Sequence, residues 1–174
     1  MIGEVSRLII GLLILLSISV VMLYKVRKLI YCCRVSSKQG CGIYAIILYL
    51  LIVLMFTVFL REYSERQYQL EILWSWKEII GIKENTKVHV ASKEGLLQEN
   101  LLNILMLFPV GLLLPIVVDG KAKKMAGLIV GTVFSVVIEI LQLIFCRGLF
   151  EWDDIIHNSL GCMIGCLLYT SRCV

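Results

Sequence analysis

Long apolar runs dominate this chain, and short polar segments separate them. Four long runs cover Leu8–Tyr24, Cys41–Leu60, Leu101–Val118 and Met125–Cys146. A fifth and shorter run, Ile155–Thr170, must extend back toward Trp152 to reach a spanning length. About 20 apolar residues in a helix cross the hydrocarbon core of a bilayer. The pattern therefore predicts an all-α fold, a polytopic membrane protein built as a five-helix transmembrane bundle.

The composition supports a membrane location. Of the 174 residues 59% are hydrophobic, and the mean hydropathy is +0.90. Soluble domains have roughly 45–50% apolar residues, and a globule of this size cannot bury so much apolar surface from water. We expect one compact membrane domain. Within it, residues 1–95 hold two N-terminal helices and an extracytoplasmic loop, and residues 96–170 form a three-helix core.

The basic residues are clustered beside the apolar runs. Lys25–Gln39 contains five basic residues and no acid, and Asp119–Lys124 contains three lysines. An excess of lysine and arginine marks the cytoplasmic side of a membrane. Five spans place both segments on that side, so we expect a multi-pass protein of the cell membrane with its N-terminus outside and its C-terminus in the cytoplasm. The first run lacks an Ala-x-Ala site and is interpreted as an uncleaved anchor. Clusters of this kind do not indicate a nucleic-acid partner.

The segment Arg61–Lys93 would then lie outside, and its acidic and basic residues are mixed. Within it, Leu70–Ile80 places Trp74 and Trp76 among polar residues. This composition suits a short helix at the membrane surface. An ordinary solvated loop helix fits it equally well.

Polar residues recur on single faces of the three C-terminal runs. The fourth run carries Thr132, Ser135, Glu139 and Gln142 on one face, the fifth carries Asp154, Asn158, Gly161 and Gly165, and the third carries Glu99 and Asn103. At about 1.5 Å rise per residue, all three faces fall in the outer half of the membrane. We therefore expect them to converge in one pocket that opens outward.

These residues also have structural interpretations. Amides and hydroxyls often only bond neighbouring helices, and Gly161-x3-Gly165 is a helix-packing pattern, here toward the fourth helix. Asp153 and Asp154 could be solvated turn residues, with Asp154 as the helix N-cap. Glu139 favours a functional role, because a carboxylate inside a span costs roughly 2.5–3.5 kcal/mol.

Arg147 is the one basic residue close to these acids in sequence. It is the natural partner for Glu139, for Asp154 or for an anionic head group. The seven cysteines form neither a disulfide framework nor a CxxC metal site. We expect no metal and no cofactor, and Cys162 and Cys166 should pack as small apolar residues.

Three motifs together resemble the VanZ-like family. They are Asn103-x4-Phe108-Pro109-x-Gly111, Ser135-x3-Glu139-x2-Gln142-x4-Arg147 and Asp153-Asp154-x3-Asn158-x2-Gly161-x3-Gly165. The resemblance covers roughly Glu99 to Tyr169 and gives no role to Glu151 or Trp152. It implies a small bacterial protein of the cell envelope linked to resistance to teicoplanin-type glycopeptide antibiotics. It supplies a process but no reaction.

The leading hypothesis is binding of an amphiphilic ligand at the outer leaflet, either a membrane lipid or a lipid-linked cell-wall precursor. The expected ligand-binding residues are Asn103, Ser135, Glu139, Gln142, Arg147, Asp153, Asp154 and Asn158. The alternative is an intramembrane enzyme that acts on a lipid-linked substrate, with Glu139, Asp154 and His157 as acid–base candidates. A coupled transporter ranks below both, because no inverted repeat is present.

Overall fold

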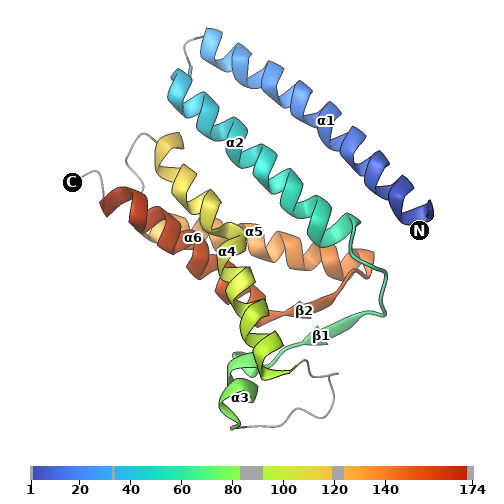
Figure 1. Cartoon of the computed structure of the whole chain (residues 1–174). Helices are drawn as coiled ribbons and strands as arrows, with labels where there is room; N and C mark the ends of the chain where they lie inside the picture. The colour runs from blue at the N-terminus through green and yellow to red at the C-terminus, as the bar shows by residue number, and fades with distance from the viewer. Residues whose placement is uncertain (1, 33, 83–91, 119–123, 172–174) are drawn as a thin grey trace.

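The computed structural model describes residues 2–32, 34–82, 92–118 and 124–171 (Figure 1). The elements in chain order are α1 (Ile2–Tyr31), α2 (Ser37–Leu54), the π-helical turn η1 (Met55–Phe59), β1 (Gln67–Gln69), α3 (Trp74–Ile80), α4 (Lys93–Val117), α5 (Lys124–Phe145), β2 (Leu149–Glu151) and α6 (Trp152–Ser171). The all-α class is confirmed. The π-helical turn continues α2 without a break, so the second apolar run ends as predicted.

Four helices in the described ranges are long and apolar enough to cross a membrane. They are Leu8–Tyr31, Ser37–Phe59, Lys93–Val117 and Met125–Phe145. The predicted count of five is therefore wrong for α6, which has the length but not the apolar composition. The reason is its start, where Asp153, Asp154, His157 and Asn158 occupy the first two turns.

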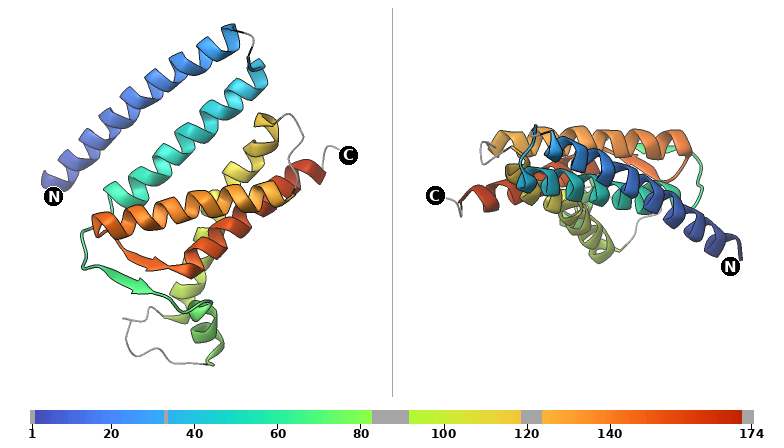
Figure 2. Two further views of the ribbon diagram at one scale, coloured as in Figure 1. Left: turned by 180° about the vertical axis from the view of Figure 1, so that it is seen from behind. Right: turned by 90° about the horizontal axis from the view of Figure 1, so that it is seen from above.

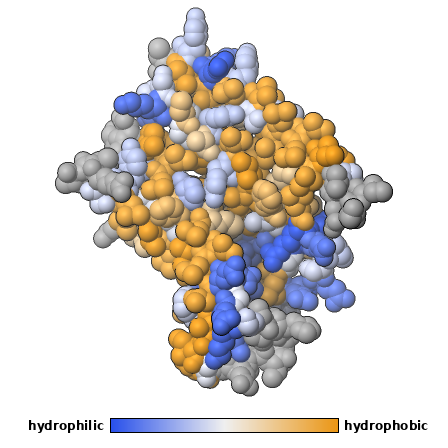
Figure 3. All heavy atoms as spheres, in the orientation of Figure 1, coloured by the Kyte–Doolittle hydropathy of each residue, from blue (hydrophilic) through white to orange (hydrophobic). Residues whose placement is uncertain are grey.

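Helix α6 lies in the middle of the fold, against α4 and α5 (Figures 1 and 2). Asp153, His157 and Asn158 are buried there, so the polar turns of α6 face protein rather than lipid. Helix α1 lies beside α2, at the edge of the fold that is farthest from α6. The face over the helices is mostly apolar, and hydrophilic residues gather toward β1 and β2 (Figure 3).

Glycines set the close approach of α6 to its two neighbours. A Cβ atom on Gly161 would collide with the carbonyl oxygen of Ile104, and one on Gly165 with that of Phe108. Both glycines thus pack against α4, and the prediction that they pack against the fourth span, α5, is wrong. The α5 contact uses glycines of α5 instead. A Cβ on Gly131 would lie 2.7 Å from that of Cys162, which is buried as a small apolar residue.

A short parallel ribbon joins two distant segments at one end of the bundle. Gln67 pairs with Leu149, and Gln69 pairs with Glu151. The sequence pattern did not predict these strands. The ribbon brings α3 to the start of α6, where Trp74, Ser75 and Glu78 are buried against the bundle. Helix α3 is therefore neither a freely solvated loop helix nor one that only lies on a membrane.

Replacing Gly161 by alanine should destabilise the protein, because α6 and α4 must separate to admit the methyl group. Overpacking of this kind costs on the order of 1–3 kcal/mol or more. We expect a clear fall in the midpoint of thermal unfolding in detergent. Ile164→Ala, on the exposed face of the same helix, is the control and should change it little. Equal midpoints for the two variants would contradict the close α4–α6 contact.

Candidate functional site

Three acidic side chains meet where α5, β2 and α6 come together, and we call Glu139, Glu151 and Asp154 the carboxylate cluster. Glu139 Oε2 accepts a hydrogen bond from the main-chain N–H of Glu151 at 3.1 Å. Asp154 accepts one from Asn103 Nδ2 at 2.5 Å, and its charge interacts with that of Glu139. Glu139 is only 1% exposed and Glu151 is also buried, while Asp154 is half-buried.

Glu151 belongs to this cluster although the resemblance gave it no role. Its Oε2 atom accepts a hydrogen bond from the indole N–H of Trp74 at 3.0 Å. Burial, followed by the negative charge of Asp154, raises the pKa of Glu151 to about 8, and the Trp74 bond partly opposes this rise. At neutral pH this carboxyl group is therefore mostly protonated. The sequence signal that could have identified Glu151 as a site residue was its position close to Asp153 and Asp154.

Arg61 supplies positive charge to the cluster. Its guanidinium group packs against Gly148, where a Cβ atom would lie 2.8 Å from Arg61 Cζ, and its charge acts on both Glu139 and Asp154. Gly148 has a φ of 126°, which glycine adopts most readily. Arg61 follows directly after η1 and Leu60 at the end of α2, and π-helical turns often occur at functional sites. Sequence analysis missed this residue.

Arg147 has a different partner from the two carboxylates that we expected. Helix α5 ends at Phe145, and Cys146 adopts a left-handed conformation, so the N–H of Arg147 bonds back to the carbonyl of Gln142 at 2.8 Å. The Arg147 side chain then donates to the main-chain carbonyl of Arg61. Within the described part of the chain, it forms no ion pair with Glu139 or Asp154. Of the three partners that we expected for Arg147, only an anionic head group remains a prediction.

Asp153 anchors α3 to α6. Its buried carboxylate accepts hydrogen bonds from the main-chain N–H groups of Leu73 and Ser75, and from Ser75 Oγ at 2.6 Å. Ser75 Oγ in turn accepts from Asn100 Nδ2 at 3.1 Å. The interpretation of Asp153 as a solvated turn residue is therefore wrong. Asp154 is not the N-cap either, because α6 already begins at Trp152.

His157 is hydrogen-bonded on one side to Trp76, whose indole N–H donates to Nε2 at 2.7 Å. An accepting Nε2 makes this a neutral imidazole with its proton on Nδ1. The buried Nδ1 atom has no partner among the described residues. His157 can carry a proton on Nδ1, but its acceptor Nε2 is already hydrogen-bonded to Trp76.

The remaining candidates bond neighbouring helices. Asn158 Nδ2 donates to Ser135 Oγ at 2.9 Å, and Gln142 Nε2 donates to the carbonyl of Thr57 at 3.2 Å. In the described residues, the buried oxygens Asn158 Oδ1 and Gln142 Oε1 have no hydrogen-bond partner. An unpartnered buried acceptor costs about 1–3 kcal/mol. These amides therefore act as links between helices and still retain unused acceptors.

Residues 42–172, about three quarters of the chain, match the model of the VanZ/LLP1 family. The chain belongs to the VanZ/LLP1 family. The family match begins in α2, well before Glu99, so it takes in Arg61 and Trp74 as well as the three motifs. It also crosses the expected division at residue 95, which remains a prediction. No curated protein and no solved structure matches the chain.

The pKa of Glu151 yields a test of the cluster. A carboxyl group whose pKa rises from 4.5 to about 8 on folding binds its proton more tightly in the folded state, so stability falls as pH rises through that interval. Glu151→Gln keeps an acceptor for Trp74 and removes the titration. At pH 8 this variant should melt several degrees higher than the natural protein, at roughly 2–4 °C per kcal/mol. The two should converge below pH 4.5, and a constant difference across this range would contradict a titrating Glu151.

Proposed function

We propose that this membrane protein of the VanZ/LLP1 family binds an amphiphilic, lipid-linked ligand of the cell envelope at the outer leaflet. Through that binding it contributes to protection against teicoplanin-type glycopeptides. The observation that carries the proposal is the carboxylate cluster, largely buried at the end of an otherwise apolar bundle. Perturbed and buried acidic groups concentrate at functional sites.

The chemistry of the cluster suits a polar head group. Protonated Glu151 offers a hydrogen-bond donor, while the free amide oxygens of Asn158 and Gln142 offer acceptors. Sugar hydroxyls and peptide amides need both kinds of partner.

The arrangement of helix ends supports the proposed orientation. The end of α1, the start of α2, the end of α4 and the end of α6 lie toward one side of the fold, and the β ribbon lies at the other (Figure 1). The first side carries Arg34 and Lys38, so it would face the cytoplasm. The carboxylate cluster, beside the ribbon, would then face outward.

Cysteine labelling tests this orientation. In a variant without its natural cysteines, a cysteine at Glu65 should react in intact cells with a maleimide that does not cross membranes. A cysteine at Lys123 should react only after the cells are permeabilised. Labelling of both positions in intact cells, or of Lys123 alone, would overturn the orientation.

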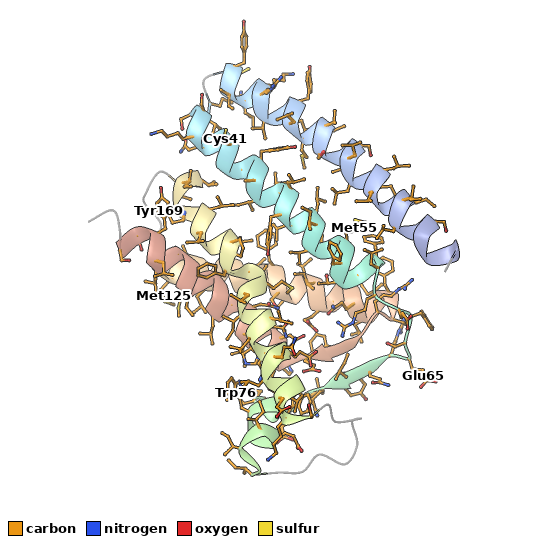
Figure 4. All side chains as sticks on the ribbon, viewed as in Figure 1. Cys41, Met55, Glu65, Trp76, Met125 and Tyr169 are labelled. Atoms are coloured by element: carbon orange, nitrogen blue, oxygen red, sulfur yellow. The ribbon has the colours of Figure 1, made fainter. Side chains whose placement is uncertain are left out.

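Glu139→Gln tests the function itself. The substitution keeps size and removes charge, and replacing a buried charge often leaves stability unchanged or raises it. We expect a protein that folds normally but loses protection of a sensitive bacterial host against teicoplanin, measured as the minimal inhibitory concentration. The matched control is Glu65→Gln, an exposed carboxylate that points away from the bundle and should leave protection intact (Figure 4). Full protection by folded Glu139→Gln would overturn the role of the cluster.

The alternative function is an intramembrane acid–base enzyme. It is favoured by the direct bond between Glu139 and the backbone of Glu151, which brings two acidic residues together, one of them with a strongly raised pKa. Such a pair suits an acid and a base. The occupied Nε2 atom of His157 argues against a third catalytic role there. Conversion of a bound lipid to a product of different mass would distinguish the enzyme from a binding protein.

A further inference from the structure

A cavity of about 330 Å³ lies between α1 and the α2–η1 helix, apart from the carboxylate cluster. We call it the α1–α2 cavity. Its walls include Ile14, Leu15 and Ile18 on one side and Leu51, Leu54 and Phe59 on the other. Met55 narrows it by packing against Gly11 of α1, and it lies between these helices in Figure 4. Both walls belong to candidate membrane spans, so hydrocarbon surrounds the cavity.

The cavity opens toward the membrane along α1. The side chains of Ile10, Ile14 and Ile18 line it and are also exposed on the outer surface of the helix. A chain that enters from the bilayer therefore meets apolar surface throughout. The dimensions suit a hydrocarbon tail rather than a folded partner, which would need a far larger contact area.

Arg147 is the one charged residue in the cavity lining. Its guanidinium group carries five N–H donors, and the described residues accept from it only through the carbonyl of Arg61. Arg147 thus lines an apolar cavity and, among the described residues, forms no ion pair. A guanidinium group binds phosphate through two parallel hydrogen bonds, which neutralise its charge.

We infer that the α1–α2 cavity holds the hydrocarbon tail of a lipid whose phosphate binds Arg147. The inference rests on the proposed function and names its ligand class, a phosphate-bearing lipid. Arg147 also holds the backbone of Arg61, whose guanidinium group lies at the carboxylate cluster. A head group that extends beyond the phosphate is thereby directed toward the cluster. Tail, phosphate and head group would each have a separate set of contacts.

Native mass spectrometry of the full-length protein in detergent tests this inference. The probes are phosphatidic acid, a diacylglycerol with the same chains, and inorganic phosphate. Phosphatidic acid should bind, diacylglycerol should bind about tenfold more weakly, and inorganic phosphate should give no stable complex. Equal binding of phosphatidic acid and diacylglycerol would overturn the role of phosphate, and binding of inorganic phosphate alone would overturn the role of the tail.

Matched variants locate the site. Leu15→Trp and Leu51→Trp fill the cavity from opposite walls, so misfolding of one still leaves the other for the test. Leu13→Trp places the same bulk on the outward face of α1 and is their control. The two filling variants should lose phosphatidic acid binding by about tenfold, and the control should keep it. Equal binding by a folded filling variant and the control would overturn the inference.

Arg147→Gln should lower binding of phosphatidic acid but leave that of diacylglycerol unchanged, and Arg147→Lys should restore part of the loss. The control is Arg66→Gln, a nearby arginine outside the cavity. If folded Arg147→Gln loses binding of both phosphatidic acid and diacylglycerol, a contact to the phosphate is contradicted.

If Leu15→Trp retains lipid while Glu139→Gln abolishes antibiotic protection, this inference fails and the proposed function stands. If cavity variants lose lipid while Glu139→Gln still protects, the proposed function fails instead.

Discussion

The enclosure of the first two turns of α6 by α4 and α5 is the constraint on which the rest of the structure depends. In hydrocarbon, polar groups without partners cost several kcal/mol each. Asp154 and Asn158 find theirs on α4 and α5, in Asn103 and Ser135. These bonds require helix axes that approach closely, and the glycines along α6 and α5 permit that approach. The glycines that permit close packing and the polar residues that bond across it therefore depend on each other.

The same constraint explains why one end of the bundle carries extra structure. The buried carboxylate of Asp153 bonds to the backbone at the start of α3. Trp74 and Trp76 then donate to Glu151 and His157. A short helix thus closes over groups that would otherwise meet either lipid or water. The two tryptophans combine apolar bulk with one donor each, which suits a cover over buried acceptors.

The sequence predicted much of the helical framework and less of the site. Runs of apolar residues defined the long helices, and helical periodicity identified the inward faces of α5 and α6. On α4 the predicted face was partly wrong, because Glu99 is exposed and the neighbouring Asn100 is buried. Periodicity tells which face is polar but not which neighbour that face meets, so Gly161 and Gly165 were matched to the wrong helix. Arg61, Trp74 and Glu151 escaped because their partners lie about 80 positions away or follow from a strand pairing with no local signal. Because the start of α6 contains few apolar residues, the predicted count of five spans was also wrong.

The Asp153–Ser75 contact has a consequence for how the protein forms in the membrane. Ser75 and Asp153 are 78 positions apart, and Trp74 is 77 positions from Glu151. Synthesis delivers α1, α2 and α3 long before their partners exist, so Arg61 and both tryptophans must wait in water or at the lipid surface. Only α5, β2 and α6, which come last in the chain, complete their contacts. The buried polar contacts of the N-terminal half of the chain therefore depend on the last sixth of the chain, which is α6 with the turn before it.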